Sequence, residues 1–232
     1  NLALMKKMIE NGYNDAQTLQ KRIEAVEEWL EDPKLLKADP NADYAAVIEI
    51  DLADIKEPIL ACPNDPDDVK LLSEVAGTTI QDVFIGSCMT NIGHFRAAAE
   101  IWRGHKFNPD VRTWICPPTR MDQAKLREES VFSIYSQVGA RIEIAGCSLC
   151  MGNQARVPDA STVFSTSTRN FDNRVGDGAQ VYLGSAELGA VISNLGRIPT
   201  VDEYMEVYRE KIEPKQDEIY RYLQFDEMEG YL

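Results

Sequence analysis

Short apolar runs that are typical of buried strands alternate, after residue 70, with segments whose apolar residues recur at helical spacing. We predict strands at 82–85, 111–116, 141–144, 162–165 and 180–183, and helices at 71–75, 91–102, 121–138 and 185–194. Such an alternation favours βαβ units. The predicted fold class is therefore α/β, with a mainly parallel sheet flanked by helices in three layers (α/β/α) and helical extensions at both ends.

The segments outside this alternation predict the domain boundaries. Helical spacing of apolar residues predicts an amphipathic helix over 15–31, the β-branched run at 46–52 predicts a strand, and the proline and aspartate residues of 56–68 predict a loop. Thr200 and Glu203 have the spacing of a capping box, so we expect a peripheral helix pair to follow them. The expected parts are a helical lead-in (1–40), an α/β domain (41–200) and a C-terminal helical extension (201–232).

Charge and cysteine content narrow the classes of function. The formal net charge of −14 disfavours a general nucleic-acid surface, because phosphate binding relies on clustered lysine and arginine. No apolar run approaches the roughly 18 residues of a membrane span, so no membrane partner is expected. Five cysteines without framework spacing or a secretory signal indicate a reducing compartment, the cytoplasm. The chain lacks an initiator methionine, and we expect it to be a piece of a longer protein.

Cysteines occur in two of the loops that follow predicted strands. Cys88 lies in 86–91, and Cys147 and Cys150 form a C-x-x-C motif in 145–154. The carboxyl ends of parallel strands meet at one edge of a sheet, so residues about sixty positions apart can share a pocket there.

The three thiols have several possible roles. They could hold an iron–sulfur cluster or zinc, the C-x-x-C pair could be redox-active, or the thiols could be inert. A redox pair gives no role to Cys88, and a zinc site needs a fourth ligand that neither His94 nor His105 supplies in a paired motif. Three sulfurs without an obvious fourth ligand suggest a cubane cluster with one open iron.

A third loop, 166–176, contains Arg169 and Arg174. The guanidinium group matches a carboxylate through two parallel hydrogen bonds, but these arginines could equally balance acids on the surface of an acidic chain. Cys62 and Cys116 are expected to be small apolar fillers, and His94 a residue of a helix surface or packing contact.

The motifs together resemble the aconitase family. The resemblance rests on Gly86-Ser-Cys-Met-Thr-Asn91, on Gly146-Cys-Ser-Leu-Cys-Met-Gly152, and on Thr168-Arg-Asn-Phe171 with Arg174, and it extends over roughly residues 40–200. It implies the cluster-bearing α/β domain of that family. It further implies that Cys88, Cys147 and Cys150 ligate a [4Fe–4S] cluster and that Arg169 and Arg174 hold substrate carboxylates.

The same resemblance implies a reaction and its partners. The family interconverts citrate and isocitrate through cis-aconitate, with no net redox change. Its serine base and its His–Asp pairs come from other domains, so we expect no catalytic residue in this chain and no activity of the chain without the remaining domains of its polypeptide. Thr168 stands where many members have asparagine, so no substrate contact is assigned to it. Alternatives are 2-methylisocitrate dehydration and binding of messenger RNA by the cluster-free protein.

Overall fold

The structure is a computed structural model that describes residues 2–147, 149–153 and 155–221. Its contacts divide the described chain into two compact units, residues 2–52 and residues 53–221. The loops that follow the predicted strands all belong to the second unit. The domain boundaries expected from the sequence stay a prediction.

The first unit contains two helices, α1 (Leu2–Glu10) and α2 (Ala16–Glu31). The helix predicted over 15–31 is confirmed. The side chain of Asp15 caps α2 by accepting a hydrogen bond from the Thr18 backbone N–H at 3.1 Å, and Leu19 and Ile23 are buried. Across the described residues, no helix combines the length and the apolar character needed to cross a membrane.

The prediction of a strand over 46–52 is wrong. This segment has no regular structure, and a short 3-10 helix, η1 (Leu52–Asp54), begins at its end. Ile48, Ile50 and Leu52 are 82%, 72% and 76% exposed. Alternating apolar residues form a stable strand only where a sheet edge and an apolar surface receive them, and the described residues leave these side chains uncovered.

Among the described residues, one sheet contains seven strands: β1 (Ile59–Ala61), β2 (Val69–Leu71), β3 (Asp82–Ile85), β4 (Arg112–Ile115), β5 (Arg141–Ile142), β6 (Thr162–Ser165) and β7 (Gln180–Leu183). Their order is β2-β1-β7-β6-β3-β4-β5. The strands from β7 to β5 pair in parallel, and β1 is antiparallel to both neighbours. The mainly parallel α/β sheet is confirmed. The prediction of a loop over 56–68 is wrong at 59–61, because β1 occupies these residues.

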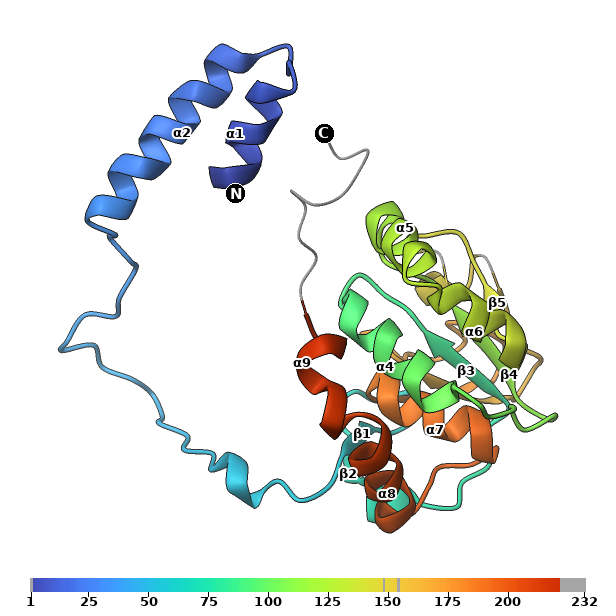
Figure 1. The fold of residues 1–232 in the computed structure, drawn as a ribbon. Helices are drawn as coiled ribbons and strands as arrows, with labels where there is room; N and C mark the ends of the chain where they lie inside the picture. The colour runs from blue at the N-terminus through green and yellow to red at the C-terminus, as the bar shows by residue number, and fades with distance from the viewer. Residues whose placement is uncertain (1, 148, 154, 222–232) are drawn as a thin grey trace. The chain divides into compact units, whose positions relative to one another are not determined.

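Helices cover the sheet on one face, where α4 (Ile92–Trp102), α6 (Val131–Val138) and α7 (Ala186–Leu195) pack together (Figure 1). The helix predicted over 121–138 is divided into α5 (Arg120–Glu128) and α6. Ser130 has φ +61°, and this left-handed residue interrupts the helix although the apolar spacing continues. The short α3 (Leu72–Val75) occupies the helix predicted at 71–75.

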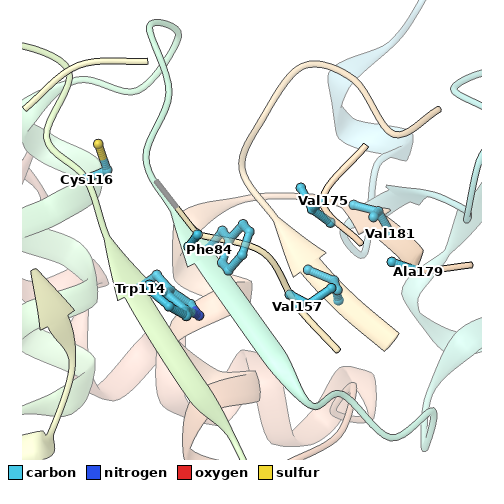
Figure 2. Close-up of a cluster of buried hydrophobic side chains, with 9 residues drawn as sticks. Phe84, Trp114, Cys116, Val157, Val175, Ala179 and Val181 are labelled. Atoms are coloured by element: carbon cyan, nitrogen blue, oxygen red, sulfur yellow. The ribbon is translucent and has the colours of Figure 1, made fainter. Parts of the chain in front are cut away.

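Side chains alternate between the two faces of the sheet, as expected for strands. The Thr113 hydroxyl contacts Ser193 of α7, at 2.9 Å between oxygens, on the helical face. The neighbouring Phe84 and Trp114 belong to a buried cluster on the other face, with their ring centroids 5.7 Å apart (Figure 2). Loop residues complete this cluster, which Figure 2 shows beside the two strands: Val157, Val175 and Ala179.

The capping box predicted at Thr200 and Glu203 is confirmed, and it opens α8 (Val201–Lys211). A 3-10 turn, η3 (Glu213–Lys215), and the short α9 (Gln216–Ile219) follow. The expected helix pair therefore exists as far as residue 219, and its remainder at 222–232 lies outside the described residues. Arg96 of α4 holds the end of α9 and the chain just after it, since its guanidinium donates to the Ile219 carbonyl at 3.4 Å and to the Arg221 carbonyl at 2.7 Å.

Candidate functional site

Four loops leave the carboxyl ends of β3, β4, β5 and β6 at the same edge of the sheet. They begin at residues 86, 116, 143 and 166. Backbone hydrogen bonds continue the parallel pairing beyond the strands, from Cys116 N to Ile85 O at 3.0 Å and from Thr166 N to Phe84 O at 3.0 Å. The loops therefore start side by side, which is the geometry expected for a site in an open α/β sheet.

Hydrogen bonds connect the three motif-bearing loops with one another. The Gly86 N–H donates to the Thr166 hydroxyl at 2.8 Å, which joins the loops after β3 and β6. The Cys150 thiol donates to the Gly86 carbonyl at 3.4 Å, which joins the loops after β5 and β3. Arg174 Nε donates to the Cys150 carbonyl, which joins the loops after β6 and β5. The motifs predicted to share a pocket thus contact one another directly.

Two of the three candidate cysteine ligands lie together. The Cys147 thiol is a hydrogen-bonding neighbour of Cys150. Burial, with a smaller contribution from Cys147, raises the pKa of Cys150 to about 12. Cys88 lies exposed on the turn formed by residues 87–90 of the adjacent loop. Within residues 2–147, 149–153 and 155–221, no three His, Cys, Asp or Glu side chains are grouped as a metal ion requires.

The two candidate arginines belong to the same loop, and the charge of Arg169 acts on Arg174. Burial, followed by the charge of Arg169, lowers the pKa of Arg174, while the neighbouring Cys150 opposes this shift. The Arg174 guanidinium carbon lies 5.1 Å from the centre of the Phe171 ring. Arg169 is exposed and Arg174 is half-buried, so both side chains retain access to solvent beside the C-x-x-C loop.

Cys116 has a larger role than the apolar filler that the sequence predicts. Its side chain is buried, and its sulfur lies 3.2 Å from both the Ile144 and the Gly146 carbonyl oxygens, so its single S–H can donate to one at a time. Cys116 therefore ties the end of β4 to the chain that leads into Cys147. The sequence gives one indication of this position, since Cys116 closes a predicted strand next to two prolines.

His94 contributes to helix capping. Its Nδ1 accepts a hydrogen bond from the Asn91 backbone N–H at 3.0 Å, and the Asn91 side chain accepts in turn from Gly93 N–H at 2.9 Å. The loop after β3 consequently ends in a fixed helix start. Cys62, the remaining cysteine, is buried directly after β1, and burial raises its pKa.

Comparison with known proteins settles the family. The sequence model of the aconitase family (aconitate hydratase) matches residues 72–196, more than half of the chain. The chain belongs to the aconitase family. The matched range of this aconitase-family chain contains all the motif-bearing loops, from 86–91 to 166–176.

Individual relatives match a larger part of the chain. Aconitate hydratase B of Synechocystis sp. is 61% identical over the whole chain, and aconitate hydratase B of Escherichia coli (strain K12) is 57% identical over the whole chain. The large subunit of 3-isopropylmalate dehydratase from Sulfurihydrogenibium sp. is 39% identical over 73% of this chain and 40% of that protein. The chain spans about a quarter of the length of the two aconitate hydratases, 26% and 27% respectively.

Proposed function

We propose that this chain supplies the cluster ligands and the substrate-binding arginines of a [4Fe–4S] hydro-lyase that interconverts citrate and isocitrate through cis-aconitate. One observation carries the proposal: in an aconitase-family chain, Arg174 donates to the carbonyl of Cys150, so a candidate substrate arginine and a candidate ligand cysteine form one site. We propose the cytoplasm as its compartment, because the five cysteines lack the spacing of a disulfide framework.

The donor set fits an iron–sulfur cluster in its chemistry. Thiolates are the usual ligands of such clusters, and the chain offers a contacting pair, Cys147 and Cys150, with Cys88 on the loop whose Gly86 carbonyl accepts from Cys150. When bound, a cluster with one incompletely ligated iron supplies a Lewis acid for a substrate hydroxyl.

The arginines bind and orient the substrate in this proposal. A tricarboxylate brings negative charge to a chain that is itself acidic, so binding requires a local positive centre. Arg169 and Arg174 provide that centre, and their planar forks can each grip a carboxylate with two hydrogen bonds. Two grips fix the rotation of the substrate in the site, which determines the carbon that faces a base.

The proposal assigns the base and the proton transfers to other parts of the polypeptide. The chain holds two histidines, of which His94 caps α4. We therefore propose that the 232-residue chain by itself has no hydratase activity. Its relatives are about four times as long, which leaves room for the missing residues.

Identity favours citrate and isocitrate over other substrates. The relatives that match the whole chain at 57–61% identity are called aconitate hydratase B, whereas the 3-isopropylmalate dehydratase subunit is 39% identical. A 2-methylisocitrate activity is a neighbouring alternative, to be tested with that substrate. The net charge of −14 disfavours RNA contacts made by this chain.

The test measures iron and sulfide in the full-length protein after anaerobic loading, together with its visible absorption. We expect about four iron atoms per chain in the wild type, a clear loss in Cys147→Ser, and unchanged content in the control Cys62→Ser. A parallel assay follows cis-aconitate by absorbance, and we expect turnover by the full-length protein but none by the 232-residue chain. Equal iron content in both variants would refute the ligand assignment.

A further inference from the structure

Asn170 stands out in the loop that carries the two arginines. Every residue of 168–173 is described, and Asn170 is the buried one among them, with 1% of its surface exposed. Its neighbours in sequence, Arg169 and Phe171, are both exposed. A buried polar side chain between exposed residues indicates an anchor, because burying an amide is unfavourable unless hydrogen bonds compensate it.

The contacts of Asn170 show what it anchors. Its Nδ2 donates to the Cys62 carbonyl at 2.6 Å and to the Val181 carbonyl at 3.3 Å. Cys62 directly follows β1 and Val181 lies in β7, and these two strands are neighbours in the sheet. Because carbonyl groups can only accept, both contacts require the amide nitrogen, and the orientation of the side chain is fixed. Asn170 therefore pins the arginine loop to the antiparallel part of the sheet.

The oxygen atom of the Asn170 amide differs from the nitrogen atom in its contacts. Asn170 Oδ1 is buried, and within the described residues it has no hydrogen-bond partner. Such a group costs free energy that an apolar residue of similar size would avoid. The side chain is thus a poor choice for packing alone, and its value lies in the two hydrogen bonds that it donates.

A second contact holds the main chain of Arg169 itself. The Ser167 hydroxyl donates to the Arg169 carbonyl at 3.2 Å, and it lies 2.9 Å from the Ser165 hydroxyl oxygen at the end of β6. The Arg169 carbonyl and the residue that follows it are consequently both held in place, whereas the Arg169 side chain is exposed and can reach a ligand. A fixed backbone lowers the ordering entropy that binding must overcome.

We propose that Asn170 is a positioning residue for Arg169 and Arg174. It holds loop 166–176 against β1 and β7, so that both guanidinium groups meet a dicarboxylate or tricarboxylate substrate without prior ordering of the loop. This proposal rests on the proposed function, because it assumes that the arginines bind substrate. In this proposal the buried Asn170 acts through the loop and is not a contact of the substrate or the cluster.

The test compares Asn170→Ala and Asn170→Ser with the control Asn108→Ala in the full-length protein. Asn108 also donates its amide to a main-chain carbonyl, that of Leu195 at 3.0 Å, but it precedes β4 at the opposite edge of the sheet. The control therefore removes a similar hydrogen bond away from the site. The serine variant keeps a polar side chain and removes fewer atoms than the alanine variant, so it gives a milder change if the alanine variant fails to fold.

We expect KM for isocitrate to rise about tenfold in Asn170→Ala, less in Asn170→Ser, and not at all in Asn108→Ala. Iron and sulfide content should equal that of the wild type in all variants, and amide hydrogen exchange should accelerate in 166–176 in the Asn170 variants only. If the wild type is active and KM is unchanged in the Asn170 variants, the positioning role of Asn170 is overturned but the proposed function is not. A wild type inactive on citrate and isocitrate would overturn the proposed function, and the positioning role with it.

Discussion

Replacing Gly86 with alanine should force β3 and β4 apart at the start of the site. Gly86 has φ +154°, in a region that side-chain-bearing residues rarely adopt. A Cβ at this position would overlap the Cys116 carbonyl oxygen and lie 2.9 Å from Cys116 Cβ. Both atoms belong to the continuation of the adjacent strand, so neither can rotate away. The same movement would displace the Gly86 carbonyl that accepts from the Cys150 thiol.

The magnitude follows from these two costs. A residue forced into a sparsely populated backbone conformation costs about 1–3 kcal/mol, and overpacking against a buried neighbour costs about 1–3 kcal/mol more. We therefore expect Gly86→Ala to lower the free energy of unfolding by about 3–5 kcal/mol, a large part of the stability of an ordinary domain. For a unit of this size the melting temperature should fall by roughly 10 °C.

The assay is thermal unfolding of the 232-residue chain, followed by circular dichroism, with Gly104→Ala as the control. Gly104 also has a positive φ, +79°, but a Cβ there would meet no atom within 4 Å. This variant carries only the backbone cost of a left-handed residue, about 1–2 kcal/mol. If the melting temperatures of Gly86→Ala and Gly104→Ala differed by less than about 2 °C, the overlap of the new Cβ with Cys116 would not destabilise the chain, and the reasoning would be refuted.

Two further predictions concern arginine–glutamate pairs. Arg96→Ala removes a largely buried guanidinium that contacts both carboxylate oxygens of Glu129, at 2.7 and 2.6 Å. Urea unfolding should therefore show that the free energy of unfolding falls by about 2–4 kcal/mol, and a fall below about 1 kcal/mol would contradict this. Hydrogen bonds from Arg197 hold the pKa of Glu203 at about 2, below its unfolded value near 4.5, so its stabilising effect is present above pH 4.5 and is lost as the pH falls toward 2. The urea midpoints of Glu203→Gln and wild type should therefore differ more at pH 6 than at pH 3. The same difference at both pH values would contradict the stabilising effect of the ionised Glu203.

The elements of the parallel core could be predicted because local sequence indicates them. The apolar runs at β3, β6 and β7 and the helical spacing of α4 and α7 each indicate one structure. Among the strands, the sequence neighbours β3 and β4, and β6 and β7, also pair with each other. The site loops followed from the same pattern, since parallel strands place their carboxyl ends at one edge.

The features that the sequence did not predict depend on distant residues or on single backbone angles. The strand expected over 46–52 has the right alternation, but alternation cannot say whether a sheet edge is available. The break at Ser130 rests on one positive φ within a continuous apolar pattern. The role of Asn170 could not be predicted because its hydrogen-bond partners, Val181 and Cys62, lie 11 and 108 positions away in the sequence.

The hydrogen bonds of the site give its loops a shared geometry. Gly86 receives the Cys150 thiol on its carbonyl and donates its N–H to Thr166, and Arg174 closes the triangle on the Cys150 carbonyl. A displacement of any one loop therefore alters the placement of the other two. Gly86 contributes backbone groups to two of these hydrogen bonds, whereas Cys150, Thr166 and Arg174 each contribute a side-chain atom. Gly86→Ala changes this shared residue, so its effect should reach the proposed ligand cysteines and the proposed substrate arginines together.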